Sequence, residues 1–390
     1  MRILIVSQYF LPQPLANAEV IGALSAGLAA RGHEVEVVAP VEASHAPPGV
    51  RVRHAFGTFA ADRRSRVARA MEYATFSIGA VLASIGGRRP DVILVPSPPP
   101  TLGLVGLVIG LVRRAPVVYN VQDLYPEAAS ATEGLSSSTA VRALRRLVRF
   151  VYRCSRAVIV IDEFFVPIIA AAEPSAMVAA VPNAIDEGPF ETGSDDMRAD
   201  LGIGPDQPVV MYAGNIGRSQ DLHAAIVATG TLSCTFVIHG DGAGLAALKD
   251  MVSAGGHDHV RFSGFRPRDE LGAVYRTGDL HLVPLKHDIA RVSVPSKLLS
   301  IFAASRPALV VAEAATPVAG IVERSRAAWR VEPGRDDELA QAIAAALSDP
   351  AELTARGERG RAWVREVASL DAMADGYESV LTAAVQRRRS

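Results

Sequence analysis

Short runs of apolar residues recur along the whole chain, and each is followed by a polar or glycine-bearing loop. In the first half these runs cover residues 3–6, 35–38, 92–95, 117–120 and 158–161. In the second half they cover residues 209–213, 235–238, 260–263, 280–283, 308–311 and 328–331. Strands that are apolar throughout, instead of alternating, are typical of parallel sheets buried on both faces. The pattern therefore predicts an α/β protein with a parallel sheet in each half.

The two halves open with the same order of elements. In the first, the strand at 3–6 leads to a proline-rich loop and a helix, with Asn17 as its N-cap and Gly32 just past its end. In the second, the strand at 209–213 leads to a glycine loop and a helix over 221–229. This order forms the βαβ unit of a doubly wound sheet. Such sheets bind ligands at the carboxyl ends of their strands, so we expect two Rossmann-like domains with an active site in the cleft between them.

Length and charge set the domain count and exclude one class of partner. A chain of 390 residues exceeds the size of one ordinary hydrophobic core. Residues 186–200 mix glycine, proline, serine and acidic residues, as linkers do. We therefore expect an N-terminal domain over residues 1–186 and a C-terminal domain over 201–370. The formal net charge of −1 argues against nucleic acid as a partner.

Cysteine content and hydropathy indicate the cellular setting. Cys154 and Cys234 are the only cysteines, so neither a disulfide framework nor a cysteine-rich zinc site is expected. The first residues do not form a signal peptide, and the longest apolar stretch, residues 101–112, is shorter than the roughly 20 residues that span a bilayer. These features predict a cytoplasmic protein without a membrane span or a metal site.

Two glycine loops in the second half are candidates for an anion site. One contains Gly214, Asn215, Gly217 and Arg218, and the other contains Gly240, Asp241 and Gly242. Free backbone N–H groups and the positive end of the following helix would both favour phosphate. Glycines that only make tight turns are the alternative, and the pattern leaves it open.

The stretch VSVPSKLLSIFAASRP predicts a helix with Pro295 in its first turn. Lys297 then lies in the same turn, where the helix dipole disfavours a cation by roughly 0.3–1 kcal/mol. An anion shared by this lysine and the helix N-terminus would reverse that sign. A lysine that bends toward solvent at little cost is the alternative, and both interpretations stay open.

Polar residues also follow a strand in the first half, in the sequence NVQDLYPEAA. Gln122, Asp123 and Glu127 come after the strand that ends at Asn120, and catalytic groups collect at such carboxyl ends in open α/β sheets. Asp123 and Glu127 could serve as a general base, as hydroxyl-binding groups or as a paired charge. The alternative is that Asp123 caps a helix and Glu127 lies on its solvated face.

A basic amphipathic helix is expected over residues 141–156. Its apolar face carries Val141, Leu144, Val148 and Val151, and its other face carries Arg142, Arg145, Arg146, Arg149 and Arg153. Arg63, Arg64, Arg66 and Arg69 add a second basic segment. Helices of this kind can lie on anionic lipid, which would give the protein a peripheral membrane contact and suit a lipid-linked acceptor. The alternative is an apolar face packed on the sheet, with solvated arginines.

Several stretches, in their order and spacing, resemble the retaining glycosyltransferases of family 4. They are RILIVSQYFLP with LAARGHEVEVVAP, DVILVPSPPP, VVYNVQDLYPE, VVMYAGNIGRSQDL, FVIHGDG, VRFSGF with LGAVYRTGDLHLVPL, and VPSKLLSIFAASRP. The chain is most similar to the branch of colanic-acid and O-antigen transferases. The resemblance covers nearly the whole chain. It implies the GT-B fold, in which a C-terminal helix, here within residues 371–390, crosses back onto the first domain.

The resemblance also implies a nucleotide-diphosphate sugar as donor, a UDP-sugar first, with no resident cofactor or metal. The residues that would face the diphosphate are Gly214, Asn215 and Gly217. Phosphate would be contacted by Ser296 and Lys297, and the base would be bordered by Phe265. Asp123 and Glu127, with Gln122 beside them, would face the sugar or the acceptor hydroxyl. The expected donor site is completed by Arg218, Gly240, Asp241, Gly242 and Ser300.

Four positions depart from the family pattern. Val292 and Ser300 stand where the family commonly carries two glutamates, the second of which holds ribose hydroxyls. Gln220 and Gln122 replace a lysine and a histidine. The leading interpretation is sugar transfer to a hydroxyl acceptor with retention, in the biosynthesis of a cell-surface polysaccharide, a glycolipid or a glycosylated metabolite. The alternatives are a nucleotide-sugar epimerase of the same fold, and a pseudo-glycosyltransferase that has become a binding or partner subunit.

Overall fold

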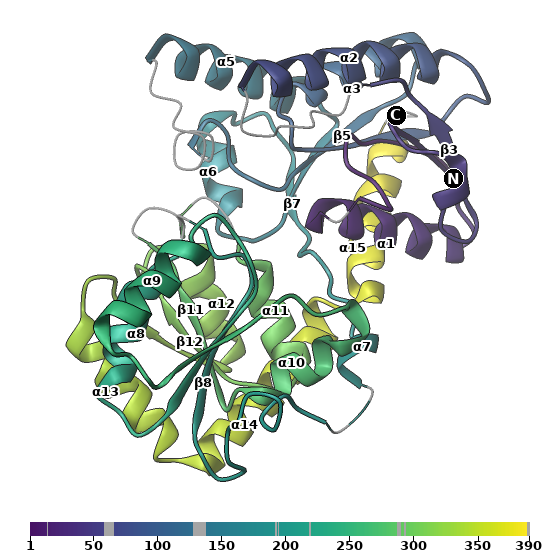
Figure 1. The fold of residues 1–390 in the computed structure, drawn as a ribbon. Helices are drawn as coiled ribbons and strands as arrows, with labels where there is room; N and C mark the ends of the chain where they lie inside the picture. The colour runs from purple at the N-terminus through teal and green to yellow at the C-terminus, as the bar shows by residue number, and fades with distance from the viewer. Residues whose placement is uncertain are drawn as a thin grey trace. The chain divides into compact units, whose positions relative to one another are not determined.

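The computed structural model describes residues 1–13, 15–57, 66–127, 138–191, 193, 195–217, 220–286, 290–291 and 294–387. The chain divides into two compact units (Figure 1). The first comprises Met1–Asn183 together with Leu370–Ser390, and the second comprises Ala184–Ser369. Each unit contains one parallel sheet with helices on both of its faces, which confirms the α/β class predicted from the apolar runs.

The sheet of the first unit has seven strands in the order β3-β2-β1-β4-β5-β6-β7. Their bounds are β1 Arg2–Val6, β2 Glu34–Ala39, β3 Val50–His54, β4 Val92–Pro96, β5 Val117–Val121, β6 Ala157–Val160 and β7 Val178–Ala180. All paired strands are parallel. The two edge strands, β3 and β7, were not predicted. An edge strand is only partly buried, so β3 alternates valine with arginine and lacks the apolar run of a central strand.

The helices of the first unit form a layer on each face of this sheet. Their bounds are α1 Ala16–Ala30, α2 Arg66–Ile85, α3 Leu102–Arg113, α5 Ser138–Cys154, α6 Phe165–Ala172 and α15 Leu370–Gln386, with a 3₁₀ turn η1 at Ala43–His45. Figure 1 shows α2, α3 and α5 along one face, and α1 and α15 along the other. The first half of the chain therefore supplies a helical layer, α2–α3–α5, whose outer side faces away from the sheet.

The sheet of the second unit has six strands in the order β10-β9-β8-β11-β12-β13. Their bounds are β8 Val209–Ala213, β9 Thr235–His239, β10 Val260–Ser263, β11 Leu280–Pro284, β12 Ala308–Val311 and β13 Ala328–Val331. All pairs are parallel. The helices are α7 Gly188–Glu191, α8 Leu222–Gly230, α9 Leu245–Gly255, α10 Leu271–Thr277, α11 Ser296–Ala303, α12 Pro317–Ser325, α13 Asp336–Leu347 and α14 Pro350–Val367, with a 3₁₀ turn η2 at Arg268–Glu270. Every strand predicted in this half is present, with its ends shifted by at most one residue.

The last helix, α15, packs on α1 and so belongs to the first unit, as the resemblance implied. Met373, Tyr377 and Leu381 on its inner face are buried. On its outer side the Arg31 guanidinium lies 3.1 Å from an Asp371 carboxylate oxygen and 2.8 Å from one of Asp375. The apolar contacts supply most of the attachment, because ion pairs as exposed as these contribute at most about 1 kcal/mol.

Local details correct two of the predicted helix ends. The helix α1 begins at Ala16 after an uncapped Leu15, so the prediction of Asn17 as its N-cap is wrong. Gly32 lies just past the end of α1 with a φ of 81°, as predicted for a glycine there. In the second half, the Asp221 side chain does cap α8, because it accepts a hydrogen bond from the Ala224 N–H at 3.3 Å. The basic helix runs over Ser138–Cys154 instead of 141–156.

Candidate functional site

The order of strands in the second unit locates a ligand crevice. β8 and β11 are neighbours, but the chain leaves β8 toward β9 on one side and continues from β11 toward β12 on the other. Loops that diverge at such a switch point leave room for a ligand at the carboxyl ends of the strands. The loop after β8 begins at Gly214, and the loop after β11 leads to α11, with Lys297 as its second residue.

Lys297 lies at this switch point and turns away from solvent. Its Nζ donates a hydrogen bond to the Tyr212 hydroxyl at 2.9 Å and lies 4.3 Å from the centre of the Tyr212 ring. The Tyr212 hydroxyl in turn donates to the backbone oxygen of Asn215 at 2.6 Å. No carboxylate pairs with Lys297 among the described residues. The alternative of a lysine bending toward solvent is therefore wrong, because Tyr212 holds the ammonium beside the glycine loop.

Burial without a counter-charge changes the acidity of this lysine. Removal from water disfavours the ammonium form and lowers the pKa of Lys297 to about 8. Tyr212 keeps its proton, because burial raises its pKa. A Cβ on Gly214 would lie 3.5 Å from Nζ and Cε of Lys297, so the loop backbone and the ammonium are immediate neighbours. A buried cation without a counter-charge is a site that an anion would stabilise.

The two glycine loops have different tasks. Gly240 and Gly242 have φ angles of 133° and 152°. A side chain on Gly240 would collide with the Gly214 carbonyl oxygen, and one on Gly242 with that of Ile216. The Ile216 N–H also donates to the backbone oxygen of Asp241 at 2.8 Å. Gly240 and Gly242 therefore allow the second loop to pack closely against the backbone of the first loop.

The other donor-side candidates differ in their exposure. Asn215 and Ser296 are exposed, Gly217 is half-buried, and the Phe265 ring is 81% exposed, in the loop after β10. The carboxylate of Asp241 is exposed and accepts the Gly242 N–H at 2.6 Å. Arg218 and Val292 lie outside the described residues.

Two residues that depart from the family pattern have partners of their own. The Gln220 side chain accepts a hydrogen bond from the Gly217 N–H at 3.2 Å, so this N–H already has an acceptor within the protein. Ser300 is half-buried on α11, and it lowers the pKa of the buried Tyr275 hydroxyl, against the larger effect of burial, which raises it. Ser300 therefore lies near a core side chain of the second unit.

In the first unit, Gln122 is part of a closed buried network. Its Nε2 donates to Oδ1 of Asn120 at 2.6 Å, and its Oε1 accepts from Nδ2 of Asn183 at 2.6 Å. Its backbone N–H donates to the Ser97 hydroxyl at 3.1 Å. The hydrogen bonds of Gln122 therefore connect the ends of β4 and β5 with the segment after β7.

Asp123 and Glu127 lie in different surroundings. No hydrogen bond or ion pair engages the Asp123 carboxylate within the part of the chain that the structure describes, and burial raises its pKa to about 6. Glu127 is exposed and pairs with Arg145 of α5 at 3.1 Å. A carboxyl group that titrates near neutrality can accept a proton or a hydroxyl hydrogen bond. Asp123 is therefore a better candidate than Glu127 for a general base or a hydroxyl-binding group.

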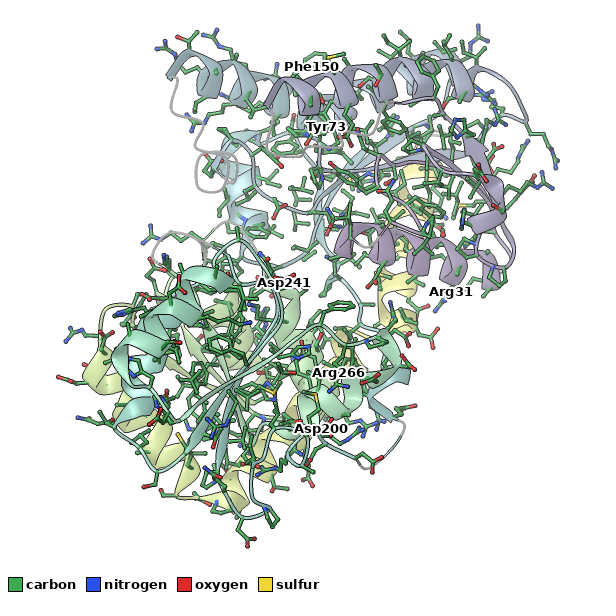
Figure 2. All side chains as sticks on the ribbon, viewed as in Figure 1. Arg31, Tyr73, Phe150, Asp200, Asp241 and Arg266 are labelled. Atoms are coloured by element: carbon green, nitrogen blue, oxygen red, sulfur yellow. The ribbon has the colours of Figure 1, made fainter. Side chains whose placement is uncertain are left out.

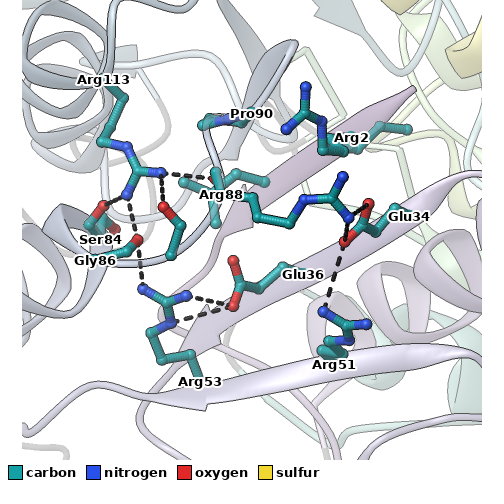
Figure 3. Close-up of a pocket in the computed structure, with 13 residues that line it drawn as sticks. Arg2, Glu34, Glu36, Arg51, Arg53, Ser84, Gly86, Arg88, Pro90 and Arg113 are labelled. Atoms are coloured by element: carbon teal, nitrogen blue, oxygen red, sulfur yellow. Dashed lines mark hydrogen bonds and ion pairs between the residues drawn. The ribbon is translucent and has the colours of Figure 1, made fainter.

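A pocket of about 180 Å³ in the first unit has a different character (Figure 3). It lies at the amino ends of β1, β2 and β3, the edge opposite Asp123. Its arginines are engaged: Arg53 with Glu36 at 2.6 Å, Arg88 with Glu34 at 3.2 Å, and Arg113 with backbone oxygens at the end of α2. These charges are satisfied by the fold, so the pocket is a poorer anion site than its arginine content suggests.

Tyr212 was not among the residues singled out from the sequence. It stands within the apolar run VVMYA and reads as a core residue. Its place could have indicated more, because a tyrosine one position before a strand end needs a polar partner for its hydroxyl at the sheet edge.

Chains of this sequence pattern have recognisable relatives. Residues 18–184 match the family model of the glycosyl transferase 4-like domain, and residues 193–363 match that of the glycosyl transferases group 1. The chain is 34% identical over 160 residues to WcaI of Escherichia coli strain K12, named for colanic acid biosynthesis and glycosyl transfer; the match covers 40% of this chain and 39% of that protein. It is 28% identical over 200 residues to the 2-deoxystreptamine glucosyltransferase of Streptomyces kanamyceticus, covering 49% of this chain and 50% of that enzyme. The matches thus span half or less of the length of these relatives.

Solved structures show the same fold. The crystal structure of Anabaena Alr3699/HepE in complex with UDP superposes with a TM-score of 0.75 and 17% identity, covering 98% of this chain and 100% of that one. No helix among the described residues is both long and apolar enough to cross a bilayer. Nor do those residues contain a group of three or more His, Cys, Asp or Glu side chains arranged for a metal ion.

Proposed function

This chain belongs to the GT-B glycosyltransferases of the family 4 type, and we propose that it transfers a sugar from a nucleotide-diphosphate donor to a hydroxyl acceptor with retention of configuration. The observation that carries the proposal is the ammonium of Lys297. It is held 2.9 Å from Tyr212, without a carboxylate partner among the described residues, beside a glycine loop at the switch point of the sheet. A diphosphate supplies the negative charge that this arrangement lacks.

The proposed donor is a UDP-sugar. Alr3699/HepE, which shares the fold, has been solved with UDP and with UDP-glucose. In this chain the diphosphate would meet Lys297, the loop that starts at Gly214, and the first turn of α11 at Ser296. The N–H groups of Gly214, Ile216 and Gly217 already donate within the protein, so Lys297 would supply the main attraction. Phe265 offers an exposed ring on which a base can stack. No resident cofactor or metal is part of the proposal.

The reaction breaks the bond between the sugar and the diphosphate and places the sugar on the acceptor oxygen. Negative charge builds up on the departing diphosphate, and the Lys297 ammonium stabilises it without reorganisation because Tyr212 already fixes its position. The acceptor hydroxyl loses a proton. We assign Asp123 to bind that hydroxyl and to promote the loss of its proton, since its pKa of about 6 leaves it ionised at pH 7 yet basic enough to share a proton.

The proposed acceptor is a hydroxyl of a lipid-linked intermediate, handled on the cytoplasmic side of a membrane. WcaI, which matches part of the chain, is named for the biosynthesis of colanic acid. The other curated relative is named for a glucosyl transfer to 2-deoxystreptamine. A polysaccharide or glycolipid intermediate and a small glycosylated metabolite therefore form the two acceptor classes to compare in an assay.

A non-catalytic role is the competing proposal, and one observation favours it. Ser300 stands where the family commonly has a glutamate, and its single hydroxyl cannot supply the two acceptor oxygens of a carboxylate. A protein that had lost its chemistry could still bind a nucleotide. Binding alone therefore does not separate the two proposals, and turnover must be measured.

The test combines a binding panel with a turnover assay. Thermal stabilisation by UDP, GDP and dTDP identifies the donor base, and UDP is expected to give the largest shift. Release of UDP from UDP-sugars, with and without a polyprenyl-diphosphate sugar acceptor, then measures chemistry. Acceptor-dependent UDP release that disappears in Lys297→Met supports the transferase. UDP binding without any release would overturn it in favour of a binding subunit, and conversion of the donor sugar without acceptor would indicate an epimerase.

A further inference from the structure

The outer side of the α2–α3–α5 layer carries large apolar side chains that the fold leaves in solvent. On α2 these are Met71, Ile78, Leu82 and Ile85, and on α3 they are Val108, Leu111 and Val112; Leu111 is 82% exposed and the others are about half exposed. Phe150 of α5 joins them, and Figure 2 shows it at the outer margin of the helices. We name these eight side chains the apolar stripe.

The core does not require the apolar stripe. On α2 the side that faces the sheet is supplied by Phe76 and Ala80, and on α3 by Val105 and Ile109, all of which are buried. The stripe residues of α2 recur at intervals of seven, four and three, and so form a second apolar line on the opposite side of the helix. Large apolar groups gathered on one exposed face mark an interaction surface.

The charge of the same layer has a single sign. α5 carries five arginines and no acidic residue. Its residues Val148 and Val151 are buried, in agreement with the alternative that the apolar face of this helix packs on the sheet. α3 has no acidic residue, and the acidic residue of α2, Glu72, is buried. Arg146 and Arg149 are exposed and have no acidic partner in the described part of the chain. The whole chain, by contrast, has 40 basic and 41 acidic residues.

The layer is held rigid at one end. The guanidinium of Arg113, the last residue of α3, donates to the backbone oxygens of Gly87 at 3.1 Å and Arg88 at 2.7 Å, as well as to those of Ser84 and Gly86 (Figure 3). These groups lie at the end of α2 and just beyond it. The two helices that carry most of the apolar stripe are therefore fixed to one another, and docking would require little ordering of this surface.

We propose that the outer side of α2, α3 and α5 docks the protein on an anionic lipid bilayer. The apolar stripe would enter the interface between headgroups and acyl chains, while the arginines of α5 meet anionic headgroups. A second copy of the chain fits this surface less well. A twofold contact would set the arginines of α5 against arginines, with no exposed acid on these helices to relieve the repulsion. The surface extends the membrane contact suggested above, but docking itself does not depend on the transferase reaction.

The test uses the full-length protein and flotation with vesicles. One set contains phosphatidylcholine alone, and the other contains a third of phosphatidylglycerol. The wild type is expected to float with the anionic vesicles at 0.1 M NaCl and to be largely released at 0.5 M NaCl, because salt screens exposed charges. In Arg146→Gln/Arg149→Gln the affinity for the anionic vesicles is expected to fall on the order of tenfold. The control removes two exposed arginines of the second unit, Arg326→Gln/Arg335→Gln, which changes the net charge by the same amount, and it is expected to float like the wild type.

The apolar half of the proposal has its own pair of variants. Leu82→Ser/Leu111→Ser is expected to weaken binding to the anionic vesicles roughly tenfold, since two apolar side chains no longer leave water. The control is Val227→Ser, which changes an exposed apolar residue of α8 in the other unit. UDP binding is measured for every variant and should stay unchanged, so a failure of docking is distinguishable from a failure of the donor site.

Three results would overturn the proposal. The first is a wild type that stays unbound on anionic vesicles at 0.1 M NaCl. The second is equal loss of binding in the Arg326/Arg335 control and the Arg146/Arg149 variant, which would indicate a non-specific charge effect. The third is a micromolar dimer in light scattering that Leu82→Ser/Leu111→Ser dissociates, which would assign the apolar stripe to a second copy of this chain.

Discussion

At the amino ends of the strands, charged side chains lie against partners, whereas at the carboxyl ends two of them do not. In the first unit Arg88, which precedes β4, contacts Glu34 at 3.2 Å, and in the second Arg198 contacts Asp279 at 2.7 Å. Asp123 and Lys297, at the carboxyl ends, have no opposite charge among the described residues. Burial shifts the pKa values of these two toward neutrality from opposite sides, to about 6 and about 8.

The difference separates charges that stabilise the fold from charges left for a ligand. A paired guanidinium satisfies backbone oxygens and carboxylates, so its removal costs stability. An unpaired buried charge costs stability by being present, so its removal should relieve the fold. Mutations of paired charges are therefore expected to lower stability and leave activity unchanged. Mutations of Asp123 or Lys297 are expected to lower activity or UDP binding without lowering stability.

The largest effect is expected for Asp123→Asn. Loss of a group that promotes the loss of the acceptor proton should lower kcat on the order of a hundredfold, while the Kd for UDP stays the same. In the wild type the rate should rise as the pH passes through about 6, where Asp123 ionises, and this limb should be absent from the variant. Steady-state rates from pH 5 to 9 measure both effects. A variant with wild-type kcat and an unchanged rising limb would remove Asp123 from the mechanism.

Lys297→Met is expected to weaken UDP binding by roughly thirtyfold to a hundredfold, because one charge-assisted contact to the diphosphate is lost. Since the folded-state pKa of Lys297 is lowered, the unfolded chain binds the proton more tightly between about pH 8 and 10, and stability rises with pH across that range. At pH 7 the methionine variant should therefore melt at the same temperature as the wild type or above it. Calorimetric titration and thermal melting give the two numbers. A variant that binds UDP normally would contradict the donor site.

Arg53→Gln is expected to lower the free energy of unfolding by about 2 kcal/mol, because Glu36 and the backbone oxygen of Ala83 lose their donor and the Gly86 oxygen keeps only Arg113. UDP affinity should not change, since Arg53 and its partners belong to the first unit and Lys297 to the second. Urea unfolding and UDP titration on the same preparation provide the comparison. If Arg53→Gln weakened UDP binding as strongly as Lys297→Met, the assignment of different roles to paired and unpaired charges would be wrong.

The smallest effect is expected for Ser300→Ala. Ser300 offers one neutral hydroxyl where the family has a carboxylate, so its removal should change UDP affinity by less than about threefold, the scale of a single weak hydrogen bond. The pKa of Tyr275 should rise further, because Ser300 lowers it in the wild type. Competition binding with UDP is sensitive enough for this comparison. A tenfold loss would show that Ser300 does take over the ribose contact of the family glutamate.

Sequence patterns were sufficient for elements whose environment is uniform. The central strands are buried on both faces, so their residues are apolar throughout and their bounds follow from the sequence alone. The same patterns did not predict the strand β3, because its alternation of valine and arginine lacks the continuous apolar run of a central strand. The N-cap of α1 failed for a related reason, since Asn17 lies inside a helix that begins at Ala16 without a side-chain cap.

The candidate site shows the same division at the level of single residues. The sequence placed Lys297, Gly214 and Asp123 at the carboxyl ends of strands, because the order of strands and loops determines which residues reach that edge. It could not show that Gln122 is enclosed by Asn120 and Asn183, nor that Tyr212 holds Lys297. Those contacts join residues that are distant along the chain, and only packing brings them together.

The sequence by itself determined the α/β class, the two parallel sheets and the edge of each sheet at which chemistry collects, since periodicity and chain order are local properties. The tertiary structure decided which charges are satisfied. It paired the arginines at the amino ends, left Asp123 and Lys297 without counter-charges in the described chain, and turned a second apolar line of α2 and α3 outward. Whether a charge or an apolar group has a partner depends on contacts across the fold, and no local pattern encodes them.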